Sequence, residues 1–568
     1  MDSAKSLLRR EFVLGTCLAV CISMPTLPVR AQDVTYERLL HAQENSADWL
    51  TYYGSYNGSR FSTLKQIDTS NVQRLVVKWA FQTGPDENFE VTPLVIDGKM
   101  YITNNRGHVF ALDAATGRMI WRYNPEVKED MPARIWGAGG HRGVSVVNGK
   151  VLVATADAFL LALDAKTGKL LWKSMVGDYQ EGQGLTSPPL VVRDKAIIGI
   201  STAEFPTRGF IDAYQVDTGK RLWRFYTVPG PNEPGHETWS GDSWKAGCGA
   251  AWLPGTFDPE LNLAYFGTGN PCAMFSGQER EGDNLYTNSI LALDPDNGVL
   301  KWHFQSVPHD VLDYDATSEL VLVDLDVDGR PTKALIQAEK NGYFYALDRQ
   351  SGRFIYGKPF VERANWTKGL DPEGGRPVPD ILPTEAGAVV CPSPWGAKSW
   401  NHMAYSPLTG YAYIPGLDVC AQIKTAKVEP KKATLYLGGD GKSVGEGARG
   451  FLAAVDAKTG DVKWRYTTKY PIFASVLATA GGLLFTGDLE GNALALDASD
   501  GRVLWKFQTG SGHRGSPITY ALNGKQYVAI PSGWGGVTHL LLPNPDAYPE
   551  LSNATKGSTL FVYGLAEQ

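Results

Sequence analysis

Short runs of alternating hydrophobic and polar residues recur along most of the chain, separated by turns rich in Asp, Asn, Thr and Gly. Segments such as TPLVIDGKMYIT and SPPLVVRDKAIIGIS carry this alternation on both sides of a tight turn, which predicts β-hairpins. A second pattern, typified by LALDAKTGKLLW, predicts a strand, a turn containing Gly, and a second strand closed by an aromatic residue. Its seven copies end at Trp121, Trp172, Trp223, Trp302, Tyr356, Trp464 and Trp505. Together the two patterns predict four antiparallel strands per repeat.

An eighth repeat is divided between the two ends of the chain. The N-terminal segment VVKWAFQTG supplies a closing strand with Trp79, and SPITYALNGKQYVAI and STLFVYGL near the C-terminus supply its other strands. Radial repetition of this kind builds β-propellers. The sequence therefore predicts an all-β fold, an eight-bladed β-propeller of four-stranded antiparallel blades, with the repeat aromatics packed between blades. Residues about 357–395, rich in Pro, Gly and Glu, form an insertion that we expect on the rim or over the channel mouth.

The N-terminal segment has the features of an export signal. Arg9 and Arg10 precede an apolar run too short to span a bilayer, and small residues at Val29 and Ala31 suit cleavage before Gln32. We therefore expect a signal peptide over residues 1–31 and one exported domain over 32–568. The paired arginines resemble a twin-arginine signal, and a general secretory signal is the alternative.

Charge argues against a nucleic-acid partner, and hydropathy argues against a transmembrane helix after the leader. The formal net charge is −6, and no basic block or stripe is present, which argues against nucleic acid. No segment beyond the leader is long and apolar enough to predict a transmembrane helix.

Four cysteines remain once the leader is removed. An even number in an oxidising compartment indicates two disulfides, and four cysteines allow three pairings. Cys248 and Cys272 flank a predicted hairpin whose turn lies at residues 258–260, and Cys391 and Cys420 bracket the predicted hairpin MAYSPLTGYAYIP. Antiparallel pairing brings the residues that flank a hairpin opposite each other, so Cys248–Cys272 and Cys391–Cys420 are the pairs that we favour. No CxxCH motif is present, so no c-type haem is expected.

The stretch HDVLDYD, which begins at His309, places three carboxylates within six residues. On an extended backbone the side chains of Asp313 and Asp315 would point to the same side and enter one pocket. Two like charges so close are unfavourable unless a cation lies between them or one is protonated. A hard cation that prefers oxygen ligands would remove the conflict and leave one carboxylate free as a general base. The alternative interpretation is a solvated acidic loop.

With these motifs in their order, the chain resembles the bacterial quinoprotein alcohol dehydrogenases. The resemblance rests on repeats ending in ALDAxTGxxxW, on GTGNP, on HDxxDYD and on a Cys pair 29 residues apart, and it covers about residues 45–565. Members of this family are eight-bladed propellers that carry pyrroloquinoline quinone (PQQ) and a metal ion near the propeller axis. The resemblance implies a periplasmic enzyme that oxidises a primary or secondary alcohol to an aldehyde or ketone. Hydride would pass to C5 of PQQ, with the metal ion as Lewis acid.

The resemblance also implies partners and a catalytic centre. Because the chain has no haem domain, electrons would pass to a separate soluble cytochrome c, from a monomer or a homodimer. Asp313 matches the family's catalytic base, which takes the hydroxyl proton of the alcohol. The metal ligands implied are Glu204, Asn270, Asp313 and Asp315. Asp315 matches the extra aspartate of the lanthanide-using branch, which favours a lanthanide(III) ion over Ca²⁺ because a trivalent ion prefers more negative oxygen ligands.

The expected cofactor site departs from the family pattern at several positions. Trp136-Gly137 stands where alcohol dehydrogenases have two adjacent cysteines in a ring over the cofactor, so Trp136 is expected to stack on the quinone instead. Ser399 replaces a family Asn and Phe473 a family Trp, while Lys340 stands where many members have Arg. Lys keeps the positive charge but loses the forked geometry. The cofactor contacts implied are Glu90, Trp136, Arg142, Thr186, Ser201, Ala203, Trp252 (as the indole floor), Lys340 and Phe473.

Two alternatives remain open from the sequence. One is a non-enzymatic propeller scaffold with the same repeats, although a scaffold has no need for four oxygen-donor residues at converging strand ends. The other is a PQQ dehydrogenase for a bulky, cyclic, polyol or polymeric alcohol, which the missing cysteine ring and the insertion would accommodate.

Overall fold

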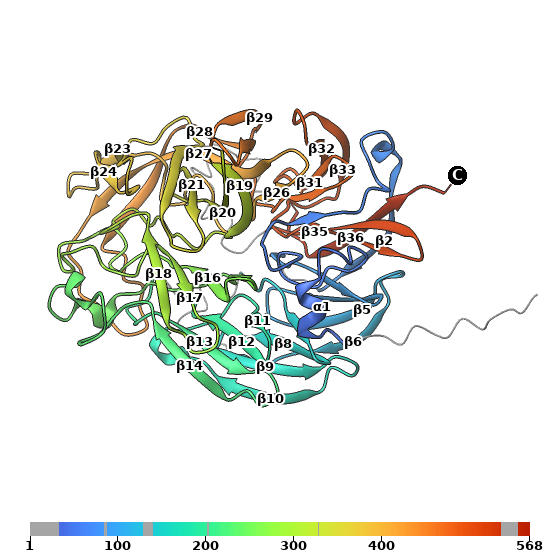
Figure 1. The fold of residues 1–568 in the computed structure, drawn as a ribbon, viewed down its shortest axis with the longest axis horizontal. Coiled ribbons are helices and arrows are strands. Elements are labelled where there is room, and N and C mark those ends of the chain that lie inside the picture. The colour runs from blue at the N-terminus through green and yellow to red at the C-terminus, as the bar shows by residue number, and fades with distance from the viewer. Residues whose placement is uncertain are drawn as a thin grey trace, which may run out of the picture. The chain divides into compact units, whose positions relative to one another are not determined.

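The computed structural model describes most of the chain after the leader. The described residues are 33–84, 88–128, 140–201, 204–327, 329–534 and 555–567, with the backbone alone at 445–448. The expected signal peptide lies outside them. They form eight blade-like sheets and one small two-stranded sheet (Figure 1). Among these residues no helix is both long enough and apolar enough to cross a membrane.

The first five blades follow one another along the chain, each as a four-stranded antiparallel meander. Blades 1 to 3 comprise β3 (Leu94–Ile96), β4 (Lys99–Thr103), β5 (Val109–Asp113) and β6 (Met119–Tyr123); β7 (Ser145–Val147), β8 (Lys150–Ala154), β9 (Phe159–Asp164) and β10 (Leu170–Met175); and β11 (Leu190–Val192), β12 (Lys195–Gly199), β13 (Phe210–Gln215) and β14 (Arg221–Tyr226). Blades 4 and 5 comprise β15 (Thr256–Asp258), β16 (Leu263–Gly267), β17 (Ser289–Leu293) and β18 (Leu300–Gln305); and β19 (Val321–Val327), β20 (Arg330–Ala338), β21 (Tyr343–Asp348) and β22 (Phe354–Pro359).

Blades 6 and 7 each carry an additional strand. Blade 6 comprises β26 (Ala404–Ser406), β27 (Tyr411–Thr425), β28 (Gly439–Asp456) and β29 (Val462–Thr468), with β25 (Ala388–Val390) paired to the far half of β27. Blade 7 comprises β30 (Leu477–Thr479), β31 (Leu483–Gly487), β32 (Asn492–Asp497) and β33 (Val503–Gln508), with β1 (Phe61–Ser62) parallel to β30. Helical turns are few: α1 (Tyr36–Leu40), η1 (Val72–Arg74), η2 (Tyr179–Glu181), η3 (His236–Thr238) and η4 (Ser243–Ala246).

Blade 8 joins the two ends of the chain, as the sequence predicts. The C-terminal strands β34 (Ile518–Leu522), β35 (Lys525–Ser532) and β36 (Thr559–Leu565) pair with the N-terminal β2 (Leu75–Gln82), in which Trp79 lies opposite Val562. The fourth strand of the last blade therefore comes from the start of the chain. This pairing, together with the seven contiguous blades, confirms the predicted propeller.

Each blade is held to the next by the aromatic residue of its fourth strand. The indole of Trp121 lies on Gly168 of the following blade, and its Nε1 donates a hydrogen bond to the Ala165 carbonyl oxygen at 3.2 Å. A Cβ at Gly168 would lie 2.6 Å from Trp121 Cε3, and the residue has a φ of +71°, so both packing and backbone require glycine. The same contact recurs at Trp79–Gly117, Trp172–Gly219, Trp223–Gly298, Trp302–Gly352, Tyr356–Gly460 and Trp464–Gly501.

The Asp-x-x-Thr-Gly turn, present in three of the repeats and varied in the others, explains the remaining recurrent residues. In blade 2, Asp164 Oδ1 accepts hydrogen bonds from the backbone N–H of Thr167 and from its hydroxyl, both at 2.7 Å, and Gly168 N–H closes the turn on the Asp164 carbonyl oxygen. In all eight blades the pairing of the third and fourth strands has a register shift beside the aromatic residue. Such a bulge bends the strand and increases its twist, here next to the residue that crosses to the neighbouring blade.

The stretch from residue 357 to 395 contains the small sheet of β23 (Thr367–Leu370) and β24 (Pro377–Pro379). It leads into β25 and the Cys391–Cys420 disulfide. Trp366 is buried and donates its indole N–H to the Asn341 carbonyl oxygen at 2.9 Å, which fastens this stretch to blade 5. In blade 6, β27 and β28 extend well beyond the other blade strands and remain paired out to Thr425 and Gly439.

Candidate functional site

One cavity of about 360 Å³ receives side chains from all eight blades. In an antiparallel meander the start of the first strand and the end of the second lie at the same end of the sheet. The loop that enters each first strand therefore reaches this cavity, and the loops after β12, β16 and β20 reach the same region. Six residues lie four positions before a first strand and line the cavity: Glu90, Thr186, Trp252, Trp400, Phe473 and Arg514.

Asp313 and Asp315 both line the cavity, as predicted, but the backbone between them is not extended. Asp313 has a φ of +63° in the loop between β18 and β19. The cause is Asp310, whose carboxylate accepts hydrogen bonds from the backbone N–H groups of Leu312 at 2.8 Å and Tyr314 at 2.9 Å. The expectation of an extended pair was therefore wrong, because Asp310 folds the loop into a turn that aims both carboxylates inwards.

The GTGN motif brings a second segment against this loop. A Cβ at Gly269 would lie 2.5 Å from Asp315 Oδ1, so this close approach is open only to glycine. The same Oδ1 accepts the backbone N–H of Asn270 at 2.8 Å, and Ala316 N–H donates to the Thr268 carbonyl oxygen at 3.0 Å. The motif therefore fixes the position of Asp315 relative to Asn270.

The acidic end of the cavity concentrates negative charge around a single cation. Lys340 Nζ donates hydrogen bonds to Asp313 Oδ2 at 2.9 Å and Asp315 Oδ2 at 3.0 Å, and Glu204 lines the same cavity. Burial raises the pKa of Asp313 well above its usual range; Lys340 opposes this shift, while the charges of Asp315 and Glu204 add to it. Burial and the charge of Asp315 raise the pKa of Glu204 to about 7. Burial alone would lower the pKa of Lys340, but the two aspartates raise it above its ordinary value.

The oxygen donors at this end suit a hard metal ion. Asn270 Oδ1 and Asp313 Oδ1 are buried, and neither accepts a hydrogen bond from any described residue. Unsatisfied buried acceptors are costly, and a cation would satisfy both while balancing the carboxylates. No three His, Cys, Asp or Glu side chains in the described part of the chain already form a group that could hold a metal. Instead, the Lys340 ammonium hydrogen-bonds to both aspartates, and the fourth expected donor, Asn270, is an amide.

The other end of the cavity has an excess of positive charge. Glu90 Oε1 lies 2.7 Å from an Arg514 nitrogen and Oε2 lies 3.0 Å from an Arg142 nitrogen, so one carboxylate is shared by two guanidinium groups. Arg142 also donates to the Thr186 hydroxyl at 2.7 Å, and Thr186 in turn donates to the Ser201 hydroxyl at 3.1 Å. The residues at this end are therefore already connected, and their net charge favours an anionic ligand.

Aromatic rings enclose this cationic end. The Arg142 guanidinium lies 5.1 Å from the ring centroid of Trp252 and 5.0 Å from that of Trp400. Arg514 lies 5.7 Å from the centroids of both Trp400 and Phe473. Flat apolar surfaces beside guanidinium groups fit a planar ring system that bears carboxylates, which describes PQQ.

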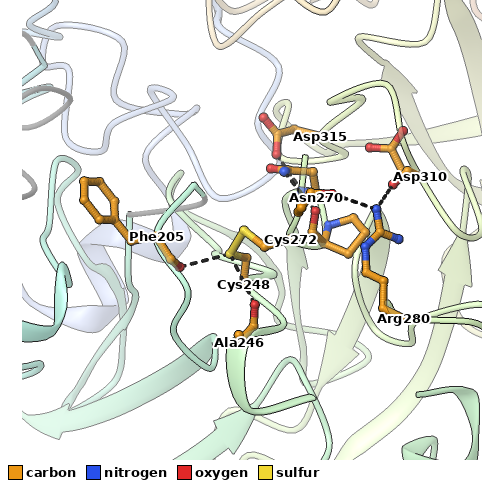
Figure 2. Close-up of a disulfide and its surroundings, with 10 residues drawn as sticks. Phe205, Ala246, Cys248, Asn270, Cys272, Arg280, Asp310 and Asp315 are labelled. Carbon is orange, nitrogen blue, oxygen red and sulfur yellow. Dashed lines mark hydrogen bonds between the residues drawn. A yellow bond between two sulfur atoms is a disulfide. The ribbon is translucent and has the colours of Figure 1, made fainter. Parts of the chain in front are cut away.

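The two predicted disulfides, Cys248–Cys272 and Cys391–Cys420, are both present. Figure 2 shows Asn270 between Asp315 and the Cys248–Cys272 bridge. The buried Arg280 donates to the carbonyl oxygens of Ala273 and Asp310, which ties the segment after the disulfide to the aspartate loop. The bridge therefore braces the acidic end of the cavity.

Most residues expected from the sequence meet in this cavity. Glu90, Arg142, Thr186, Ser201, Glu204, Trp252, Asp313, Asp315, Lys340 and Phe473 line it, and Asn270 contacts Asp315 from behind. Trp136 and Ala203 lie outside the described residues.

The sequence reasoning missed Arg514, Trp400, Trp395, Met274 and Phe275, which also line the cavity. A usable signal existed for the first two, since they precede first strands by the same four positions as Glu90 and Trp252.

Comparison with known proteins places this geometry in context. A family model described as "PQQ: Glucose/ethanol/alcohol dehydrogenase, beta-propeller domain" matches residues 49–373 and 467–528. The quinoprotein alcohol dehydrogenase PedH of Pseudomonas putida is 38% identical over 565 residues, with 94% of each chain covered. The lanthanide-dependent methanol dehydrogenase of Methylacidiphilum fumariolicum is 34% identical over 578 residues, covering 93% of this chain and 94% of that protein.

Two solved structures of alcohol-oxidising quinoproteins are similar to this chain over most of its length. A europium-containing methanol dehydrogenase aligns with a TM-score of 0.87 at 34% identity, covering 93% of this chain and 100% of its own. The quinohemoprotein alcohol dehydrogenase of Comamonas testosteroni aligns with a TM-score of 0.87 at 34% identity, covering 94% and 83% of the two chains.

Proposed function

The chain belongs to the PQQ-dependent glucose/ethanol/alcohol dehydrogenase family, and from that premise we propose how its own residues carry out the reaction. The protein is a PQQ- and metal-dependent alcohol dehydrogenase, so the non-enzymatic scaffold interpretation was wrong. When bound, PQQ supplies the hydride acceptor and the metal ion a Lewis acid. What is proposed below is the role of individual side chains, the metal and the partners.

Asp313 is proposed as the base that takes the hydroxyl proton of the alcohol. The observation that carries this assignment is the environment of its carboxylate: Oδ2 is held by Lys340 at 2.9 Å, while Oδ1 is buried in the cavity and accepts no hydrogen bond from a described residue. Burial and the nearby carboxylates raise its pKa towards the range in which a carboxylate accepts a proton efficiently. Lys340 limits this rise and keeps the carboxylate oriented.

Glu204, Asn270, Asp313 and Asp315 are proposed as the metal ligands. Three carboxylates and one amide oxygen are hard donors, and the Lys340 ammonium balances only one of the three negative charges that full ionisation would create. We favour a lanthanide(III) ion over Ca²⁺ because Asp315 adds a further negative donor. Metal binding at Asp315 Oδ2 would have to displace or share the Lys340 hydrogen bond.

The cationic end is proposed to hold the cofactor. Arg142 and Arg514 would bind its carboxylates, Thr186 and Ser201 would extend that network, and Trp252 would provide a flat surface for its rings. Trp136 and Ala203 remain predicted cofactor contacts on sequence grounds alone.

The protein is also proposed to act in the periplasm, as a monomer or homodimer, and to pass electrons to a soluble cytochrome c. The leader-like N-terminus and two disulfides support export, since disulfides persist in oxidising compartments. The absence of a CxxCH motif in the sequence supports a separate electron acceptor.

Reconstitution tests the metal assignment. Apo-protein of the wild type and of Asp315→Ala receives PQQ with La³⁺ or Ca²⁺, and alcohol oxidation is followed with an artificial dye while metal affinity is measured by calorimetry. We expect activity and tight binding with La³⁺ in the wild type and the loss of both in Asp315→Ala. Activity with Ca²⁺ alone would overturn the lanthanide assignment, and failure to bind PQQ with either metal would overturn the cofactor site.

A further inference from the structure

One wall of the cavity differs from both charged ends. It is formed by residues 274–275 and 394–395 together with Leu437, Gly439, Asp440 and Gly441. Its only charged member is Asp440, which is exposed. Phe275, Trp395 and Leu437 present apolar side chains to the cavity. Apart from the exposed Asp440 carboxylate and the Trp395 indole N–H, the side chains of this wall offer a substrate no hydrogen-bonding group. Covering its apolar surface with an apolar part of the substrate would be favourable.

The apolar wall is fixed in place by backbone hydrogen bonds. Beyond the paired ends of β27 and β28, Phe275 N–H donates to the Leu437 carbonyl oxygen at 2.7 Å, and Met274 N–H to that of Tyr436 at 3.3 Å. Tyr436 N–H donates to the Glu204 carbonyl oxygen at 2.8 Å. The wall is therefore tied to the same segment that carries Glu204, which places an apolar surface next to the acidic end of the cavity.

Two glycines at the start of β28 have different reasons to be glycine. Gly439 has a φ of +150°, and a Cβ there would lie 2.0 Å from the Lys424 carbonyl oxygen, so the backbone requires it. Gly441 has no such constraint: it pairs with Ile423 in the regular ladder, and a Cβ there would lie 3.4 Å from both Phe275 Cζ and Pro394 Cγ. Both of these neighbours line the cavity.

A side chain at position 441 would therefore grow between Phe275 and Pro394, where the cavity reaches an exposed strand residue. Since neither backbone conformation nor a clash at Cβ demands glycine, the property that Gly441 provides is open space. The absent side chain widens the cavity at its apolar wall.

We propose that Gly441 determines substrate size, and that the alcohol oxidised by this enzyme has a bulky apolar body, aromatic or branched, that packs on the wall of Phe275, Trp395 and Leu437. This inference rests on the proposed function and names its substrate class. A small alcohol reaches the base without touching this wall, so its turnover depends little on residue 441.

The test uses the reconstituted full-length enzyme with two probe alcohols, ethanol and benzyl alcohol. Values of kcat/KM are measured for the wild type, Gly441→Ala, Gly441→Leu and the control Lys442→Leu, in which the same side chain is added at the next, exposed residue of β28. We expect the benzyl alcohol to ethanol ratio of kcat/KM to fall at least tenfold in Gly441→Leu and by a smaller factor in Gly441→Ala. The ratio should stay unchanged in Lys442→Leu, and PQQ affinity should stay unchanged in all three variants.

Each outcome separates the inference from the function on which it rests. A ratio that stays constant in Gly441→Leu, or that falls equally in Lys442→Leu, would overturn the size-determining role while leaving the dehydrogenase intact. If Gly441→Leu fails to fold by thermal unfolding, the ratio in Gly441→Ala decides. No oxidation of either alcohol by the wild type with any metal would overturn the proposed function, and the inference with it.

Discussion

The interfaces between blades and the central cavity are made from the same repeated sheets, yet most interblade indoles satisfy their polar groups while key oxygen atoms of the cavity do not. Between blades, Trp121 donates its indole N–H to Ala165 at 3.2 Å, and Trp172 donates to Val216 at 3.0 Å. In the cavity, Asn270 Oδ1 and Asp313 Oδ1 are buried without a hydrogen-bond partner among the described residues. Packing and polar satisfaction agree at these two interfaces and conflict in the cavity; among the other interblade aromatics, the Trp464 indole N–H is buried without a hydrogen-bond partner in the described part of the chain.

The contrast separates residues that stabilise the fold from residues that serve the reaction. A buried carboxylate next to others of the same charge destabilises the folded chain. The frame of docked aromatics and a disulfide-braced loop holds Asp313 and Asp315 in place despite that cost. Lys340 offsets only part of this cost, and a bound cation would offset more, so we expect stability and activity to respond to mutation in different directions in the cavity.

The largest effect is expected from Asp313→Asn, which removes charge from the cavity without changing its shape. We expect kcat to fall about 10²–10⁴-fold, because the proposed proton acceptor is lost. The thermal-unfolding temperature of the apo-protein should stay the same or rise, because one of several crowded charges is gone. Steady-state kinetics, metal content and thermal unfolding are measured together, with the exposed Asp326→Asn as control. A large drop in stability would show that Asp313 belongs to the frame rather than to the reaction.

Trp121→Ala probes the frame and should have the opposite signature. Deleting the indole leaves a cavity beside Gly168, which should lower the free energy of unfolding by about 3–5 kcal/mol. The kcat per folded molecule should be unchanged. Trp121→Phe keeps a ring but loses the hydrogen bond to Ala165, and should cost only about 1 kcal/mol beyond the change in packing. Stability is measured by denaturant titration. A loss of kcat without a loss of stability would contradict the assignment of Trp121 to the structural frame.

A smaller effect is expected from Arg514→Leu, at the cationic end of the cavity. Removing one of the two guanidinium groups that share Glu90 should weaken PQQ binding to apo-protein roughly tenfold, about 1.4 kcal/mol. Arg514→Lys should recover part of the affinity, because it keeps the charge and loses the fork. Binding is followed by spectroscopic titration, and the exposed Arg502→Leu is the control. Unchanged affinity in Arg514→Leu would mean that Arg514 serves only to neutralise Glu90.

Much of the site could be predicted because its motifs are local. The Cys248–Cys272 pair follows from a short hairpin, and the nearness of Asp313 to Asp315 follows from the single residue, Tyr314, between them. The predicted extended backbone between the two aspartates was nevertheless wrong. The hydrogen bonds of Asp310 that turn the loop could not be inferred from alternation alone.

Arg514 was missed for a different reason. Its sequence context, GHRGSPITY, contains no chemical motif, and an isolated Arg is usually an exposed residue. Its position four residues before β34, equivalent to that of Glu90 before β3, becomes meaningful only when the repeats are aligned by their first strands.

The blades could be predicted from sequence, because strand alternation, an Asp-x-x-Thr-Gly or related Gly-containing turn and the closing aromatic are encoded within each repeat. The sequence also predicted the ring, since the missing strand of the last blade is present at the N-terminus. Which loops meet, in contrast, depends on the tertiary fold. Glu90 near one end of the chain lies 2.7 Å from Arg514 near the other, and Lys340 joins two aspartates of a neighbouring loop. Such contacts depend on ring closure around a common centre, where the entry loops of all eight blades converge, and no local pattern specifies that convergence.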